Sequence, residues 1–234
     1  MRFQNAVNPN YHYFFLINYF TNQGATLGVG DQNAPGPVAV REPANSNLGY
    51  GNGFATGSGG SAFGFTDFVR FEGNAYRLFH VVGDPTESHF QDEGQPVAFT
   101  LPNSSQPTTL QFTIDLAQLV VQSNGAALPS ATDTVNIARG IIWLQMNIVA
   151  TNVIPIHQTA VVDKQVDSLG NTLTPTGASS FLILNMSQIQ TYTNQTFAGQ
   201  AVFEPGDNDV FGAVNPDPSL DLIDYSISVV QQQQ

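Results

Sequence analysis

An aromatic-rich run near the start of the chain, YHYFFLINYF at residues 11–20, places the strongest constraint on the fold. Aromatic residues favour strands, and both faces of this run are largely apolar, as in a strand that is covered on each side. The run is half the length of roughly 20 residues that a membrane helix needs, and TNQG after it supplies a turn. We therefore predict a central β-strand and no membrane insertion.

Three further segments alternate apolar and polar residues with the period of two that marks a half-buried strand. They are TTLQFTID (108–115), IIWLQMNIVA (141–150) and DLIDYSISVV (221–230). In the second segment, the alternation predicts that Trp143 lies on the polar face together with Gln145 and Asn147.

A hairpin is predicted for FTDFVRFEGNAYRLFHVV (65–82). Its two β-rich halves flank Gly73-Asn74, which can supply the positive φ angles of a tight turn. Helix signals are weaker, and DLAQLVVQ (115–122) is the single short helical segment that we expect.

These elements predict an all-β fold, a single antiparallel β-sandwich of the jelly-roll or immunoglobulin-like kind with long Gly/Pro-rich loops. A closed barrel is the alternative architecture. The longest loop, residues 24–62, holds NLGYGNGFATGSGG and three prolines, and we expect it to pack as a structured surface loop. No linker composition divides the chain, so residues 1–234 are predicted to form one domain, with 1–10 and 225–234 available for intersubunit contact.

Several stretches are similar to known sandwich proteins. YHYFFLINYFTNQG (11–24) resembles the opening strand and turn of domains related to the DOMON and family 9 carbohydrate-binding modules. GYGNGFATGS (49–58), TDFVRFEGNAYRLF (66–79) and PDPSLDLIDYSISVV (216–230) resemble, in the same order, parts of a group of microbial secreted proteins. The resemblance implies a sandwich fold and secretion, and it implies no known reaction.

The chain is unusually poor in charged residues. Only 10% are Asp, Glu, Lys or Arg, against roughly 25% in ordinary soluble domains, and an uncharged polar surface suits chains that pack against copies of themselves. The 6 Lys and Arg are scattered and the net charge is −12, which excludes the basic footprint of a nucleic-acid-binding protein. There is no Cys, so disulfides and thiolate sites are excluded. An acidic chain with few Lys fits an extracellular or cell-surface setting.

EPGDNDVFG (204–212) is the strongest calcium candidate. Asp207 and Asp209 lie one residue apart in a turn-forming sequence, so both carboxylates could converge on one ion. Calcium takes six to eight oxygen ligands, so Glu204 and Asp217 are expected to contribute. The alternative is that these side chains only shape turns.

Trp143 is the candidate for carbohydrate binding. On a polar strand face it would form an exposed platform for stacking a sugar ring of a polysaccharide, and the alternative is a core position, because a single Trp is normally buried. Catalytic residues are not predicted: TGSGGS (56–61) fits neither a nucleophile elbow nor a phosphate loop. No carboxylate pair for glycoside cleavage can be named.

Three functional classes follow. The first is a non-enzymatic extracellular structural protein that self-assembles into a surface filament, sheath or layer. The second is a calcium-dependent carbohydrate-binding module, and the third is a sandwich-fold glycan-active enzyme. Low charge and the lack of catalytic motifs favour the first class.

Assembly is predicted to use the chain ends. A strand near an end can add to the sheet of a neighbour, and a chain whose single Lys is Lys164 lacks the commonest protection of strand edges. The alternative is that both ends pair within their own subunit. The predicted anchors are Phe3, Val7, Tyr225, Ile227 and Val229.

Overall fold

The computed structural model describes residues 1–21, 67–81, 90–120, 130–152, 165–169, 182–194 and 215–230. The Gly/Pro-rich tract at 24–62 lies outside these residues, so the surface loop expected there stays a prediction.

Within the described residues the chain forms strands and two short helices. The strands are β1 (Arg2–Phe3), β2 (His12–Thr21), β3 (Asp67–Glu72), β4 (Ala75–Val81), β5 (Phe90–Gly94), β6 (Ala98–Thr100), β7 (Gln111–Thr113), β8 (Ile141–Thr151), β9 (Val166–Ser168), β10 (Leu182–Asn185), β11 (Gln190–Thr193), β12 (Leu222–Asp224) and β13 (Ser226–Val229). The helices are the 3-10 helix η3 (Leu116–Leu119) and α2 (Ala131–Arg139).

β2 lies in the interior of the largest sheet, as its aromatic sequence predicts. This sheet runs in the order β10-β8-β2-β3-β4-β5, and β9 also pairs with β8. β2 pairs antiparallel with β8 along its length and with β3 on its other side. Both faces of β2 are buried, with one face formed by Tyr13, Phe15 and Ile17 and the other by Phe14, Leu16 and Asn18. A strand covered on both faces has to be apolar on both.

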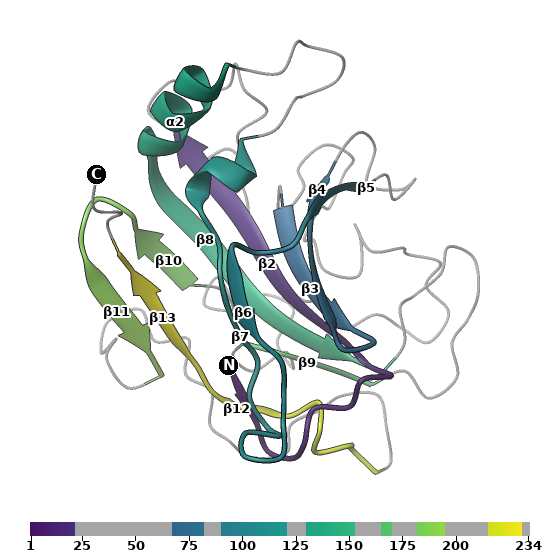
Figure 1. The fold of residues 1–234 in the computed structure, drawn as a ribbon. Coiled ribbons are helices and arrows are strands. Elements are labelled where there is room, and N and C mark those ends of the chain that lie inside the picture. The colour runs from purple at the N-terminus through teal and green to yellow at the C-terminus, as the bar shows by residue number, and fades with distance from the viewer. Residues whose placement is uncertain are drawn as a thin grey trace, which may run out of the picture.

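Three two-stranded sheets, β1–β12, β6–β7 and β11–β13, form a second layer. Figure 1 shows β6 and β7 in front of the long strands β2 and β8, with β11 and β13 to the left and β12 below. Their buried residues share one core with the inward face of β2. Phe3, for example, packs edge-on against Tyr13 with 4.8 Å between ring centroids. All strand pairs in the described residues are antiparallel, and the fold is an all-β antiparallel sandwich, as predicted.

The predicted hairpin forms as β3 and β4. Gly73 and Asn74 have φ angles of 55° and 62°, the left-handed values that a two-residue type I′ turn requires. From this turn the register runs outward to the pair Asp67↔His80. Two residues of the turn therefore decide which side chains meet along the whole hairpin.

Two strand expectations need correction. From Leu144 onward β8 is buried on both faces, including Gln145 and Asn147, because it lies beside β2 in the interior of the sheet. The segment 221–230 is not one strand: it breaks at Tyr225, so that β12 pairs with β1 and β13 pairs with β11. A period of two in the sequence does not reveal a change of partner.

The helical segment expected at 115–122 is present as η3, capped by Asp115. Helix α2 is not predicted by the strand pattern. Ser130 caps α2 by accepting a hydrogen bond from the N–H of Asp133 (3.2 Å), and Gly140 follows its last residue. These two residues are the sequence signals of its ends. Neither helix in the described ranges is long and apolar enough to cross a membrane.

Candidate functional site

β6 is an edge strand that exposes apolar side chains. It pairs with β7 on one side, and among the described strands none pairs with its other side. Val97, Phe99 and Leu101 are 57%, 38% and 40% exposed. Val97 is at a bend directly before β6, and Leu101 directly follows it. We call these three exposed side chains, spaced two residues apart about the strand, the apolar row. Phe99 contacts the Tyr76 ring at 5.4 Å between centroids, which places Phe99 on the face of β6 that packs toward the core.

The hydroxyl of Tyr76 joins β6 to β7. It accepts a hydrogen bond from the N–H of Gln111 (3.0 Å) and donates one to the carbonyl of Thr100 (3.3 Å). Burial raises the pKa of this phenol to about 12, and the hydrogen bond from Gln111 opposes the rise only in part. Tyr76 therefore stays protonated at neutral pH and keeps the O–H group that donates to the carbonyl of Thr100.

The same contact fixes the direction of the β6 backbone. Thr100 directs its carbonyl toward β7 through Tyr76. Successive residues of an antiparallel strand direct their N–H and C=O groups to opposite edges, so the polar groups of Phe99 face the open edge. The open edge of β6 can therefore accept another strand by main-chain hydrogen bonds.

No charge protects this edge. Residues 94–114 contain no Asp, Glu, Lys, Arg or His, whereas natural edge strands are commonly guarded by charges, above all Lys. Pro96 and Pro102 bracket the strand and leave its centre unguarded. The motifs and spacings discussed above do not single out the apolar row. Its signal in the sequence is the alternation VAFTL between two prolines in a charge-free stretch.

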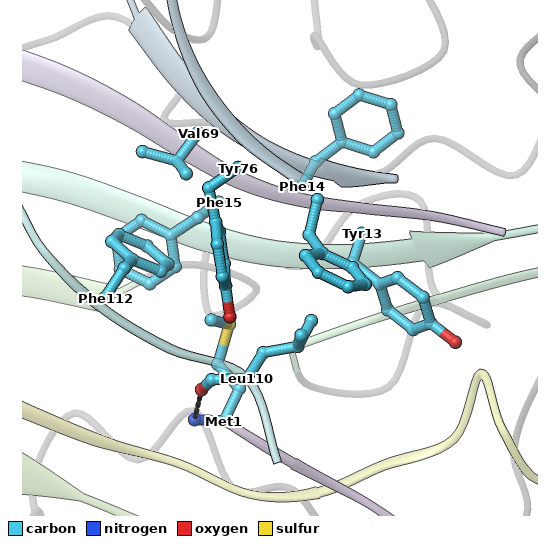
Figure 2. Close-up of a pocket in the computed structure, with 9 residues that line it drawn as sticks. Met1, Tyr13, Phe14, Phe15, Val69, Tyr76, Leu110 and Phe112 are labelled. Carbon is cyan, nitrogen blue, oxygen red and sulfur yellow. Dashed lines mark hydrogen bonds between the residues drawn. The ribbon is translucent and has the colours of Figure 1, made fainter. Parts of the chain in front are cut away.

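A small apolar cavity lies behind the β6–β7 pair. Figure 2 shows the rings of Phe15, Tyr76 and Phe112 beside it, and the hydrogen bond from the amine of Met1 to the carbonyl of Leu110 (3.1 Å) at its other end. The cavity volume is about 10 Å³, which is at most the space for one water molecule. Sites for small organic ligands measure about 300–1,000 Å³, so this cavity is a gap in packing and not a ligand site.

Both chain ends pair within the chain. β1 completes a sheet with β12, and β13 completes one with β11. Four of the predicted assembly anchors are therefore buried in the chain's own core and the fifth, Ile227, is partly buried against it; the four are Phe3, Val7, Tyr225 and Val229. This is the alternative arrangement stated above. Exchange with a neighbour would first have to detach a strand that is already paired.

Most of the predicted calcium site lies outside the described residues, namely Glu204, Asp207 and Asp209. Asp217 is described, and neighbouring groups bind its carboxylate. Its Oδ2 accepts a hydrogen bond from the hydroxyl of Tyr11 (2.7 Å), and its Oδ1 accepts from the N–H (2.9 Å) and the hydroxyl (2.8 Å) of Ser219. Burial opposes ionisation of Asp217, but these hydrogen bonds outweigh it and lower its pKa.

Among the residues that the structure describes, no group of three or more His, Asp or Glu side chains is placed to hold a metal ion. The calcium site stays a prediction, because the residues that carry it are not among those described.

Trp143 is 39% exposed, but the polar residues predicted to lie beside it are not. Gln145 is buried, and its Oε1 accepts a hydrogen bond from Nδ2 of Asn18 (2.9 Å). Asn147 is also buried, and its Oδ1 accepts from the N–H of Leu169 (3.2 Å). Trp143 is therefore exposed without the polar strand face that was expected to extend it into a platform.

Asp67 and His80 form a buried pair that no sequence motif marks. Their Oδ1 and Nδ1 atoms lie 2.9 Å apart across the β3–β4 register. Burial raises the pKa of nearby Glu93 on β5, against the attraction of His80. Counting outward from the Gly73-Asn74 turn would have paired Asp67 with His80 from the sequence alone.

Comparisons with known proteins place the chain in no family. No family model matches it, and neither does any curated protein or any solved structure. The similarity to DOMON and family 9 carbohydrate-binding domains therefore stays a prediction, and the functional argument rests on the geometry above.

Proposed function

We propose that the protein is a non-enzymatic structural protein of an extracellular or cell-surface filament, sheath or layer, which assembles with copies of itself. The observation that supports this most directly is the open edge of β6, along which the apolar row of Val97, Phe99 and Leu101 is exposed. An exposed apolar edge without guarding charges is a site where strands of other chains add. Fully burying a large apolar side chain contributes about 1.5–3 kcal/mol, and covering the exposed part of each residue in the row supplies a share of this energy to drive association.

The net negative charge opposes association of copies at long range, whereas the charge-free edge of β6 permits it at short range. The net charge of −12 makes copies repel, but salt screens exposed charges beyond about 8 Å at physiological ionic strength. Because residues 94–114 are free of charge, little repulsion remains at the edge. Association is therefore expected to strengthen as salt rises, up to the point where repulsion is screened.

Sedimentation velocity and negative-stain microscopy of the full chain test the proposal, over concentrations from about 1 μM to about 1 mM, where weak interfaces associate. Phe99→Lys places a charge in the centre of the apolar row. Val135→Lys makes the same kind of change at a residue of α2 that is 41% exposed and serves as the matched control. We expect the wild type and Val135→Lys to associate alike and Phe99→Lys to lose the association that the β6 edge provides.

Phe99 also contacts Tyr76, so circular dichroism must show that Phe99→Lys is folded. Thr100→Lys is a second variant, which changes the exposed opposite face of β6. It leaves the apolar row intact but still places a Lys on the edge, so it should weaken association as Phe99→Lys does. A wild type that stays monomeric at every concentration and salt, with and without Ca²⁺, would contradict the proposal.

A second candidate function is calcium-dependent carbohydrate binding, which the exposure of Trp143 favours. An exposed indole can stack on a sugar ring without further aromatic residues. A shift of Trp143 fluorescence on an insoluble polysaccharide, reversed by chelator, would support this candidate.

A further inference from the structure

The segment that contains β6 is nearly symmetric in residue type about Phe99. It reads QPVAFTLPN over residues 95–103. Moving outward from Phe99, the residues at equal distance are the small pair Ala98 and Thr100, the aliphatic pair Val97 and Leu101, the prolines Pro96 and Pro102, and the amides Gln95 and Asn103. The outer three pairs each match in chemical class, and Ala98 and Thr100 match only in being small.

This symmetry has a direct meaning for strand pairing. When a strand pairs antiparallel with its own copy about a two-fold axis, residues at equal distance from the axis lie opposite each other. With the axis at Phe99, Val97 of one copy faces Leu101 of the other, and the two Phe99 side chains face each other. Opposed apolar side chains of this kind stabilise a pair of strands.

The backbone agrees with this axis. The N–H and C=O groups of Phe99 face the open edge, so the two copies of Phe99 can exchange both hydrogen bonds directly across the axis. Pro96 and Pro102 lack N–H groups and limit regular pairing at the two ends. The symmetry therefore delimits a short ladder over residues 97–101.

We infer that the β6 edges of two copies of this chain pair antiparallel about a two-fold axis through Phe99, which joins two β6–β7 sheets into one four-stranded sheet. The inference rests on the proposed self-assembly and names its first contact. A strand from an unrelated protein would satisfy the same main-chain groups, but it would give no reason for residues 95–103 to be symmetric. A two-fold contact closes with two subunits, so a filament or layer is built from these dimers through a second surface.

Single cysteines test the register, because the chain has none of its own. Opposed residues of an antiparallel pair have Cα atoms about 4.5–5.5 Å apart, within the range that a disulfide spans. We expect mild oxidation to convert most of the Phe99→Cys protein to a disulfide dimer. Val97→Cys alone should give no dimer, because four positions along a strand separate it from its copy by about 13 Å.

A mixture of Val97→Cys and Leu101→Cys keeps Phe99 in place and should give the mixed dimer, which mass spectrometry identifies. Ser105→Cys, exposed in the chain after β6, controls for random oxidation of surface thiols and should stay monomeric. The predicted pattern is thus one self-pairing variant, one mixed pair and one inert control.

The outcomes separate the two proposals. A wild type that is monomeric throughout overturns both the self-assembly and its register. A wild type that associates while Phe99→Cys and the mixture fail to cross-link, or while Val97→Cys cross-links with itself, overturns the two-fold pairing and leaves self-assembly through another surface.

Discussion

Asp67 and His80 face each other across the β3–β4 hairpin, with Oδ1 of the carboxylate 2.9 Å from Nδ1 of the imidazole and both side chains buried. Neither residue is near the other in sequence. The turn at Gly73-Asn74 brings them together, because it fixes the register of every pair along the hairpin. The two turn residues therefore determine that Asp67 and His80 meet in the interior.

Removing one member of this pair should be costly. Asp67→Ala leaves the ring nitrogen of His80 buried without its carboxylate, and losing one partner of a buried hydrogen bond lowers the free energy of unfolding by about 1–3 kcal/mol. Asp92→Ala is the control, because its 3.6 Å contact with Arg77 and the hydrogen bond it accepts from the N–H of Gly94 (2.8 Å) are both exposed, and exposed ion pairs contribute about 0–1 kcal/mol. Urea unfolding at neutral pH measures both. Equal losses in the two variants would count against a structural role for the buried pair.

Gly73 should resist substitution for reasons of backbone conformation alone. A Cβ at Gly73 meets no atom within 4 Å, but the residue has φ +55°. Gly73→Val is expected to lower the free energy of unfolding by about 1–2 kcal/mol, because left-handed φ values strain residues with a Cβ. Gly73→Asn should cost less, since Asn adopts this region more readily. Denaturant unfolding compares the two variants, and an equal cost would mean that strain is not the cause.

Local determinants explain which parts of the fold were predictable. The hairpin follows from Gly73-Asn74, and the central strand follows from the aromatic run at 11–20, because in each case the determining residues lie inside the element. The two-sided burial of β8 depends instead on which strands lie beside it. Its polar residues Gln145 and Asn147 look like a solvent face in the sequence, yet they satisfy hydrogen bonds inside the sheet.

The exposure of the candidate site on β6 depends on long-range packing even more than the burial of β8 does. Nothing within residues 97–101 says whether another strand will cover their edge, so the exposure of the apolar row emerges only from the whole sandwich. The predicted anchors near the chain ends are instead covered by other strands of the same chain. Phe3 and Tyr225 are apolar near chain ends, which predicts contact with a neighbour, but the structure pairs both ends with distant strands of the same chain.

Tyr76 should stabilise the β6–β7 sheet and make it sensitive to alkali. Tyr76→Phe removes the hydroxyl between Gln111 and Thr100, and we expect a loss of about 1–3 kcal/mol because two main-chain groups lose this partner. The folded pKa of Tyr76 is raised from 10.0 to about 12. The unfolded phenol therefore ionises first, and the stability that Tyr76 contributes is lost as pH rises above 10.

Urea unfolding as a function of pH checks this sign. The wild type should lose stability above pH 10, and Tyr76→Phe should lose less over the same range. Because burial also raises the pKa of Tyr13 and Tyr19, some alkaline loss should persist in the variant. An identical slope in the two proteins would show that the Tyr76 phenol ionises as freely in the folded state as in the unfolded state.

Trp143 gives a direct readout of surface exposure, since it is the single Trp of the chain. With 39% of the residue exposed, its fluorescence should be quenched by acrylamide in the folded protein, although less than in urea. Binding to a polysaccharide should reduce this quenching. Emission that acrylamide cannot quench would place the indole in the core and remove the observation that favours carbohydrate binding.

Val229 and Val230 are adjacent residues of one type with opposite environments, 7% and 68% exposed, and they test where the C-terminal strand is held. Val229→Ala should lower the free energy of unfolding by about 1–3 kcal/mol, because it opens a cavity in the core. Val230→Ala should change it by less than about 0.5 kcal/mol, as at other surface positions.

If β13 pairs with β11 of its own chain, the loss in Val229→Ala is the same at every protein concentration. Both proteins are therefore compared in the Phe99→Lys background, which removes the contact proposed at β6. There, stability rises with concentration if β13 is exchanged with a neighbour, because association and folding are then linked. Thermal unfolding at protein concentrations that differ about 100-fold separates the two, since in the linked case that difference changes the association term by about 2.7 kcal/mol. A concentration-independent loss would leave the edge of β6, and not the chain end, as the surface through which copies meet.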